Sequence, residues 1–205
     1  IYNINENKIS VIYWAPFLSS YTKIVDKNYQ NPFLLFVGNR HKYKNAYKFL
    51  EAFSKNKFLF NNFRIIFFGG GKFNNFEKKT INKLNLEKKI TLINGSDNEL
   101  INLYKNAEAL VYPSQYEGLG LPILESMSHG CPVITSYSSG MLEAGGKAVE
   151  YFDPNNIESI SSSIVKALES KNYAKKLINS GYDQVKHFSW QLCSKQTFEI
   201  YKKLL

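Results

Sequence analysis

The stretch YEGLGLPILESMSHGCPVITS, residues 116–136, carries the signals for a loop, a helix and a buried strand in succession. Pro122 suits the first turn of a helix, where its missing N–H costs nothing, and Gly130 suits a helix end. The apolar, β-branched run that follows is typical of a short buried strand. We therefore predict a helix that begins near Leu121 or Pro122 and stops at Gly130, followed by a strand over 132–136.

The mouth of this predicted helix has the features of an anion-binding site. Its first N–H groups have no partners within the helix and lie at the positive end of the helix dipole. Gly118 and Gly120 remove side chains where a ligand would approach the backbone. Glu117 precedes the glycines and Glu125 lies about one turn into the helix, so both carboxylates are expected to flank one pocket and accept hydrogen bonds from ligand hydroxyl groups. The alternative interpretation is that Glu125 only stabilises the helix dipole and that Glu117 is a solvated loop residue without a ligand.

Outward from this stretch, short apolar strands alternate with amphipathic helices as far as about residue 150, and the remainder is helical. The expected strands cover 8–14, 33–38, 63–69, 89–94, 108–113, 132–136 and 148–152. Such alternation favours a parallel sheet covered by helices on both faces. We predict an α/β fold with a doubly wound parallel sheet, a Rossmann-like lobe, followed by a C-terminal helical tail over 155–205.

A second loop after a strand carries positive charge. The segment FVGNRHKYKNAYKFLEAF, residues 36–53, leads from a strand into a helix that Asn45 is predicted to cap. Arg40 and Lys44 lie between them, and Arg64 is the other arginine of the chain. Because ligands of doubly wound sheets bind beyond the carboxyl ends of the strands, Arg40 and Lys44 are candidates for neutralising a diphosphate. A solvated basic loop is the alternative interpretation.

The composition is that of an ordinary globular chain with a basic surface. The 205 residues carry a net charge of +9 and a pI near 9.3, which favours anionic partners. The two cysteines are too few for a disulfide framework, and the sequence contains neither a signal peptide nor an apolar run of membrane-spanning length. We expect a reducing, cytoplasmic setting, which includes the inner face of a membrane.

Together the two loops resemble the C-terminal lobe of retaining glycosyltransferases of the GT-B fold, specifically family four. The Glu-x7-Glu pattern from Glu117 to Glu125, followed by the strand CPVITS, is similar to the signature of that family. The segments YKNAEALVYPS and EYFDPNNIESISSSI match the flanking regions in order and spacing, and the resemblance runs from about Ile9 to the C-terminus.

The resemblance implies a role for each matching residue. Arg40 and Lys44 would hold the diphosphate of the donor, Glu117 would bind hydroxyls of the transferred sugar, and Glu125 would accept hydrogen bonds from the ribose. Backbone amides that reach the sugar and phosphates are expected at Gly118, Leu119, Gly120 and Leu121. The donor would be a UDP- or GDP-linked sugar, and transfer would proceed with retention and without a bound metal or other cofactor.

The resemblance also implies a division of labour between two lobes. Residues 1–205 would form a single nucleotide-sugar-binding lobe, and the N-terminal lobe that accommodates the acceptor would be absent from this sequence. We therefore expect little transferase activity from the chain alone. The acceptor, a glycan or a lipid-linked glycan, would bind through the missing lobe, with peripheral membrane contact as a further expectation.

Several other functions remain open at this point. A GT-B-like epimerase would convert a nucleotide sugar without an acceptor, and a non-catalytic module would only bind it. A phosphorylase would need a cofactor lysine in a pattern that is not found, and a glycosidase would use the paired glutamates but leave Arg40 unexplained. Gly69, Gly70 and Gly71 are compatible with a phosphate cradle, but the family resemblance implies a strand-to-helix turn there. We do not expect nucleic-acid binding, because the basic residues do not interleave with aromatic ones as a stacking platform requires.

Overall fold

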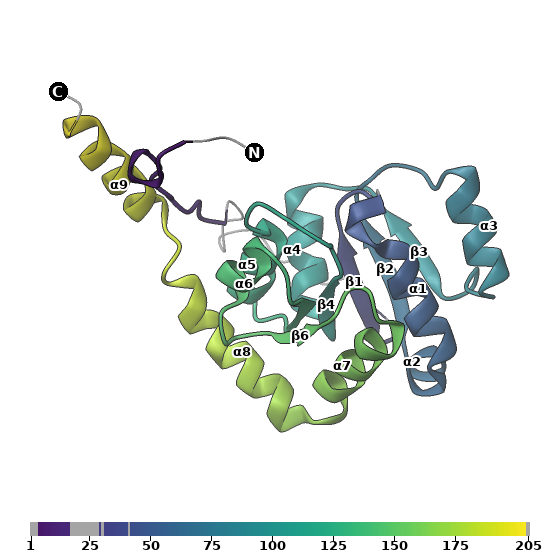
Figure 1. The fold of residues 1–205 in the computed structure, drawn as a ribbon. Coiled ribbons are helices and arrows are strands. Elements are labelled where there is room, and N and C mark those ends of the chain that lie inside the picture. Colours follow the sequence, from purple (N-terminus) through teal and green to yellow (C-terminus); the bar gives the residue numbers. More distant parts are fainter. Residues whose placement is uncertain (1–3, 17–28, 30, 41, 204–205) are drawn as a thin grey trace.

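The protein is built on a parallel sheet with the strand order of a dinucleotide-binding fold (Figure 1). The computed structural model describes residues 4–16, 29, 31–40 and 42–203. Within them, the strands run in the order β3-β2-β1-β4-β5-β6, and every pairing is parallel. Their bounds are β1 Phe33–Val37, β2 Arg64–Phe68, β3 Ile90–Ile93, β4 Ala109–Tyr112, β5 Val133–Ser136 and β6 Glu150–Phe152. This confirms the predicted doubly wound sheet.

The central strands are apolar on both sides because helices cover both faces of the sheet. Alternate residues of β1 enter two separate cores: Leu34 and Phe36 lie in one, and Leu35 lies in the other. The first face is covered by α1 (Ala46–Lys55), α2 (Lys57–Asn62), α3 (Asn75–Lys83) and α7 (Ile157–Glu169). The second is covered by α4 (Asp97–Asn106), α5 (Leu121–Ser128) and α6 (Gly140–Gly145).

The strand order changes direction between β1 and β4. From β1 the chain builds outward to β2 and β3, and it then returns to place β4 on the other side of β1. The loops after β1 and β4 therefore lead to helices on opposite faces, and in folds of this kind ligands bind at the carboxyl edge where such loops diverge. These are the two loops in which the sequence predicted the site.

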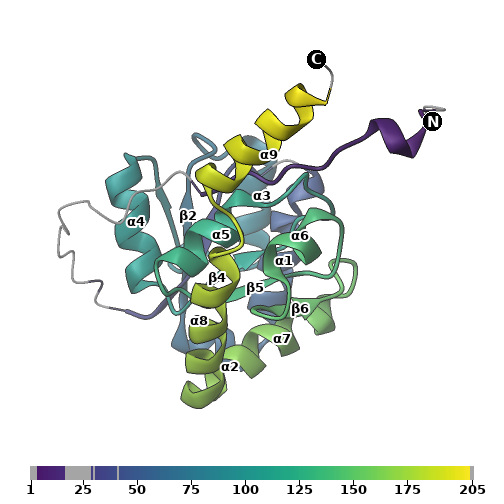
Figure 2. The ribbon, with the colours of Figure 1, turned by 90° about the vertical axis from the view of Figure 1, so that its left-hand side faces the viewer.

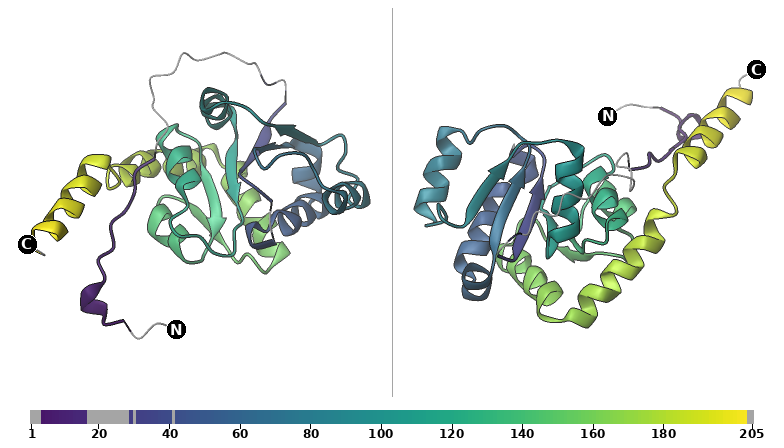
Figure 3. Two further views of the ribbon diagram at one scale, coloured as in Figure 1. Left: turned by 90° about the horizontal axis from the view of Figure 1, so that it is seen from above. Right: turned by 180° about the vertical axis from the view of Figure 1, so that it is seen from behind.

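The helical tail divides into a packed part and an extended part. Helices α7 and α8 (Lys171–Val185) contribute buried residues to the body, whereas α9 (Trp190–Lys202) has no buried residue. Ser189 caps α9, since its side chain accepts a hydrogen bond from the Leu192 amide. Figures 2 and 3 show α9 and the N-terminal segment leaving the body on the same side.

The strand predicted over 8–14 is wrong. Short helical turns η1 (Glu6–Lys8) and η2 (Lys42–Lys44) are found, but residues 9–16 are irregular, and Val11 and Trp14 are 68% and 60% exposed. The segment has strand-like alternation of apolar residues. It lacks a paired neighbour among the described residues, and a strand is stable only when its backbone groups are paired.

None of the helices in the described part of the chain is long and apolar enough to cross a membrane.

Candidate functional site

Two charged side chains meet between the loops that follow β1 and β4, at the expected ligand crevice of the fold. Lys44, at the end of η2, donates a hydrogen bond of 2.6 Å from Nζ to Oε1 of Glu117, which lies in the loop after β4. Nζ also donates to the hydroxyl of Tyr112, at 3.1 Å. The Lys44 and Glu117 side chains are only 12% and 14% exposed, so the ion pair is screened little by water. Sequence reasoning selected both residues, and the structure brings them together.

Packing between the two loops holds this pair in place. The Gln115 amide donates to the Tyr43 carbonyl at 2.7 Å, and the rings of Tyr43 and Tyr116 stack with centroids 5.1 Å apart. Tyr112 also holds Lys44, since its hydroxyl accepts from the Lys44 ammonium and its ring centroid lies 5.3 Å from Nζ. Burial raises the pKa of the Tyr112 hydroxyl far above its ordinary value, and the neighbouring Glu117 carboxylate adds to the shift, so Tyr112 remains protonated.

The helix mouth is built as the sequence predicted. Helix α5 begins at Leu121, with Pro122 in its first turn, and it is preceded by Gly120 at φ 86°, a left-handed conformation that glycine adopts without strain. Among the described residues, no acceptor is found for four consecutive amides at this mouth: Gly118, Leu119, Gly120 and Leu121. A Cβ on Gly118 would meet nothing within 4 Å, so open space adjoins the backbone at that residue.

The loop after β5 supports the helix mouth, and sequence reasoning missed it. The Glu117 amide donates to Oγ of Ser139 at 2.9 Å, and the Gly140 amide donates to the Glu117 carbonyl at 3.2 Å. Ser139 has φ 41°, a strained value for a residue with a side chain. A Cβ on Gly140 would overlap the Gly118 carbonyl oxygen. The signal in the sequence is the Ser-Ser-Gly segment of residues 138–140, which begins two residues after the end of a buried strand.

The second carboxylate of the signature is held by a tyrosine. Glu125 projects from α5, half-buried, and the Tyr104 hydroxyl of α4 donates to its Oε2 at 3.0 Å. Burial raises the pKa of Glu125, and this hydrogen bond partly offsets the shift. The ring of His129 stacks on that of Tyr104, and its Nδ1 lies 2.8 Å from the Glu125 carbonyl oxygen.

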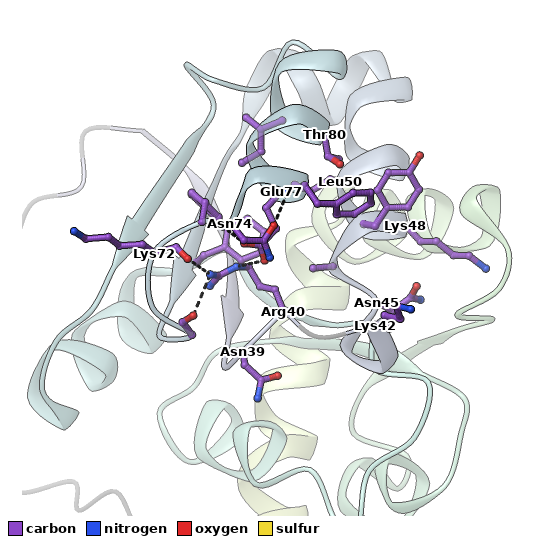
Figure 4. A pocket seen from close by; sticks show the side chains of 17 residues that line it. Asn39, Arg40, Lys42, Asn45, Lys48, Leu50, Lys72, Asn74, Glu77 and Thr80 are labelled. Carbon is purple, nitrogen blue, oxygen red and sulfur yellow. Dashed lines mark hydrogen bonds and ion pairs between the residues drawn. The ribbon is translucent and has the colours of Figure 1, made fainter.

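The structure does not bring Arg40 to Lys44 and Glu117. The Arg40 guanidinium turns toward the loop after β2 (Figure 4), where Nε donates to Oε1 of Glu77 at 2.8 Å. Its terminal nitrogens donate to the carbonyl oxygens of Gly69, Gly70, Gly71 and Lys72 at 2.9–3.4 Å. The side chain is 4% exposed. A direct contact with a diphosphate would require this cluster to open, and the predicted contact remains untested.

The same cluster explains the three consecutive glycines. Gly69, Gly70 and Gly71 all have positive φ, between 69° and 82°, which turns their carbonyl oxygens toward Arg40. An added Cβ on Gly70 would lie 2.6 Å from Nη1 of Arg40. The turn therefore binds the guanidinium of Arg40 through its carbonyl oxygens. The alternative of a phosphate cradle at these glycines is not supported, because their acceptors rather than their donors converge.

Asn45 precedes α1 as predicted but does not cap it. It has φ 58°, and its side chain makes no hydrogen bond with the first turn of the helix. Its Nδ2 donates instead to the Pro154 carbonyl at 2.7 Å. The prediction was right about the start of the helix and wrong about the function of the side chain, which links the loop after β1 to the segment before α7.

Comparison with curated proteins identifies relatives among mannosyltransferases. The chain is 43% identical over 108 residues to the O-antigen chain mannosyltransferase B of Escherichia coli, a match that covers 53% of this chain and 28% of that protein. It is 33% identical over 166 residues to the O-antigen chain mannosyltransferase RfbU of Salmonella typhimurium, covering 80% of this chain and 45% of that protein. The chain thus spans less than half the length of these two relatives.

Solved structures share the fold at similar partial coverage. A glycosyltransferase from Rickettsia africae ESF-5 matches with a TM-score of 0.74 and 26% identity over 84% of this chain and 48% of that one. The Anabaena protein HepE, solved with UDP and glucose, also gives a TM-score of 0.74, at 17% identity over the same shares of the two chains. Residues 20–184 match the family described as Glycosyl transferases group 1, and the chain belongs to that family.

Proposed function

We propose that this chain binds a nucleotide-diphosphate sugar in the crevice between β1 and β4, for retaining transfer of the sugar to a glycan or lipid-linked acceptor. One observation carries the proposal: Lys44 and Glu117, from the two loops that diverge at this crevice, lie 2.6 Å apart beside the open amides of the α5 mouth. A cation and free N–H groups suit a diphosphate, and a carboxylate suits sugar hydroxyls.

In this proposal Lys44 and the helix mouth stabilise the leaving group. Breaking the bond between sugar and phosphate leaves negative charge on the nucleoside diphosphate. Lys44 and the amides of residues 118–121 would donate hydrogen bonds to the phosphate oxygens from positions that the fold already holds. Such preorganised donors lower the activation barrier of bond cleavage most where water is excluded. Glu117 already accepts from Lys44 through Oε1, and we propose that it also binds sugar hydroxyls. No metal ion or cofactor is required by this arrangement.

Glu125 is proposed to bind the ribose. Tyr104 donates to one carboxylate oxygen, Oε2. A vicinal diol can donate to the other, as the family resemblance implies. Because Glu125 lies within the first turns of α5, a ligand whose diphosphate meets the helix mouth would extend its nucleoside toward this carboxylate.

The sugar is proposed to be mannose on a UDP or GDP carrier. The support is the naming of the relatives, because the O-antigen proteins of Escherichia coli and Salmonella typhimurium are both mannosyltransferases. Those names also favour transfer over the epimerase and over a module that only binds.

We further propose that residues 1–205 act as the donor-binding lobe of a two-lobed enzyme, with 155–205 as its helical tail. The chain covers 48% of the matched Rickettsia africae structure, which agrees with one lobe of two. By itself it would bind donor but transfer sugar poorly. The enzyme would act in the cytoplasm or at the inner face of a membrane, where the net charge of +9 attracts anionic lipids.

Calorimetric titration of the chain with UDP, GDP, ADP, their mannose and glucose conjugates, and inorganic pyrophosphate tests the proposal. We expect saturable binding of one nucleoside diphosphate and its sugar. Glu125→Ala is expected to weaken the nucleoside diphosphate while leaving pyrophosphate nearly unchanged, because the ribose contact is lost and the diphosphate contact is not. Equal losses for both ligands would contradict the ribose role, and the absence of binding to every nucleotide would contradict the proposal.

A further inference from the structure

A cavity of about 660 Å³ lies between α1 and α3, apart from the crevice just described (Figure 4). It is bounded by the loops after β1 and β2. Lys44, Glu117 and Glu125 do not line it, although its volume falls within the range of small-molecule sites. The proposed donor site therefore leaves it unexplained.

Arg40 and Glu77 form a neutral wall of this cavity. Their side chains pair at 2.8 Å, and the remaining Arg40 donors are taken up by backbone carbonyls. The guanidinium also lies 4.8 Å from the centroid of the Phe73 ring. The wall presents a ring and a compensated ion pair, so it contributes little net charge to the cavity.

Three lysines give the opening a net positive charge. Lys42, Lys48 and Lys72 line the cavity, and Glu77, already paired with Arg40, is the carboxylate in the lining. The Lys48 ammonium donates to the backbone carbonyl oxygen of Asn155 at 3.1 Å and to its side-chain Oδ1 at 3.3 Å, and both acceptors are uncharged. Within residues 4–16, 29, 31–40 and 42–203, no carboxylate pairs with any of the three lysines. In Figure 4, the side chains of Lys48 and Lys72 extend in opposite directions from the two sides of the cavity, so each would turn on its flexible stem to reach an anion at the opening.

The lining also exposes aromatic surface. Tyr47 of α1 and Phe76 of α3 face each other with ring centroids 6.3 Å apart, yet they remain 42% and 69% exposed. Behind them the lining includes Leu50, Phe67 and Ile81, which are buried in the core. An exposed phenylalanine on a short polar helix gains stability only when something covers it. A ligand with an apolar or aromatic body would cover both rings.

We propose that this cavity binds an organic phosphate, with its apolar or aromatic body against Tyr47 and Phe76 and its phosphate held by Lys42, Lys48 and Lys72. Lysine is a flexible point charge that suits phosphate, and three ammonium groups exceed the charge of a phosphate dianion. The site differs from the proposed donor site in residues and in position. Its occupant could be a free nucleotide or the headgroup and proximal chain of an anionic lipid, which share this chemistry.

The test is carried out on a Lys44→Ala variant of the 205-residue chain, so that binding in the β1–β4 crevice is suppressed. Titrations use inorganic phosphate, uridine monophosphate and dihexanoyl phosphatidic acid below its micelle concentration. We expect saturable binding of the nucleotide or of the lipid, at least about tenfold tighter than inorganic phosphate, because the apolar body contributes. Whichever of the two binds identifies the source of the ligand.

Two matched substitutions locate the binding. Phe76→Ala and Lys72→Ala are each expected to weaken it by on the order of tenfold, whereas Phe198→Ala on α9 and Lys83→Ala on α3 leave it unchanged. Phe76 and Lys72 are exposed, so the folded core survives both changes. The proposal is overturned if neither organic phosphate binds at millimolar concentration, if inorganic phosphate binds equally well, or if the control substitutions weaken binding as much. None of these outcomes bears on the donor site.

Discussion

The Tyr104 hydroxyl donates a hydrogen bond of 3.0 Å to Oε2 of Glu125, and the two residues come from different helices, α4 and α5. Tyr104 is fully buried, and burial raises the pKa of its hydroxyl well above the ordinary value, so it always carries its proton. In this hydrogen bond Tyr104 is therefore always the donor and the Glu125 carboxylate always the acceptor. It fixes the carboxylate and compensates part of the cost of burying its charge.

The first prediction concerns Tyr104→Phe, which removes this donor without changing the size of the ring. Glu125 would lose a hydrogen bond to its charged form, so its pKa should rise further and its orientation should loosen. We expect nucleoside diphosphate affinity to fall by roughly 1.5–3 kcal/mol, while pyrophosphate affinity is unchanged. Calorimetry measures both, with Tyr201→Phe on the exposed α9 as control. A parallel loss for pyrophosphate would argue against a positioning role.

The second prediction uses the raised pKa of Glu125. The folded protein holds this proton more tightly than the unfolded chain does, so stability falls as pH rises from about 4.3, the ordinary carboxyl value, through the raised pKa. Glu125→Gln cannot titrate and can still accept from Tyr104. As pH rises across this interval, the wild type should lose stability and the variant should not. The free energy of unfolding of the variant, measured with urea, should therefore increase relative to that of the wild type. At pH 7 the variant should be at least as stable, yet bind nucleotide more weakly. A difference independent of pH would refute the assignment.

The third prediction concerns Lys44→Ala. Loss of the ammonium should weaken nucleoside diphosphate and pyrophosphate alike, by roughly 1.5–3 kcal/mol, because the contact is with the phosphates. It also leaves the Glu117 carboxylate without its ion pair, which should lower the free energy of unfolding by about 1–3 kcal/mol. Adding Glu117→Gln removes that buried charge, so the double variant should regain stability without regaining affinity. Lys83→Ala on α3 is the control for a surface lysine. Diphosphate affinity of wild-type strength in either Lys44 variant would exclude this residue from the site.

Much of the fold followed from local signals in the sequence. Pro122, Gly130 and the apolar periodicity between them identified the α5 helix, whose backbone hydrogen bonds are local. Buried apolar runs identified β1 to β6, because strands that are covered on both faces of a sheet are apolar throughout. The segment over 8–14 shows the limit of this reasoning. Its alternation was adequate, but a strand depends on a neighbour, and no local pattern reveals whether one is present.

Site residues could be predicted where they lie in a loop that directly follows a strand. They could not be predicted where their role depends on a contact with a distant part of the chain. Glu117 and Lys44 were found because each follows a strand at the same sheet edge. Tyr104 and Ser139 were missed, since a tyrosine on a helix and a serine in a turn have no distinctive spacing. The Arg40 contacts also depend on tertiary structure, because Glu77 lies 37 residues away along the chain.

The fourth prediction compares two glycines at the helix mouth. Gly118→Ala should leave the free energy of unfolding unchanged, since a Cβ there meets nothing within 4 Å, but it should weaken diphosphate binding by occupying the space beside the free amides. Gly140→Ala should destabilise the fold by about 1–3 kcal/mol, because its Cβ would overlap the Gly118 carbonyl oxygen. Urea denaturation and calorimetry on both variants separate the effects. Unaltered diphosphate affinity in a stable Gly118→Ala protein would mean that the ligand does not approach the backbone there.

The fifth prediction decides between two roles for Arg40. As the structure has it, Arg40→Ala removes the partner of the largely buried Glu77 carboxylate and of four carbonyl oxygens, so the free energy of unfolding should fall by about 3–5 kcal/mol. Arg40→Lys should recover a minor part, because an ammonium cannot reproduce the planar fork. The fraction that remains folded should bind pyrophosphate with wild-type affinity. If instead Arg40→Ala were as stable as the wild type and bound pyrophosphate more weakly by roughly 1.5–3 kcal/mol, the guanidinium would leave its carbonyl partners for the ligand, as the family resemblance implies.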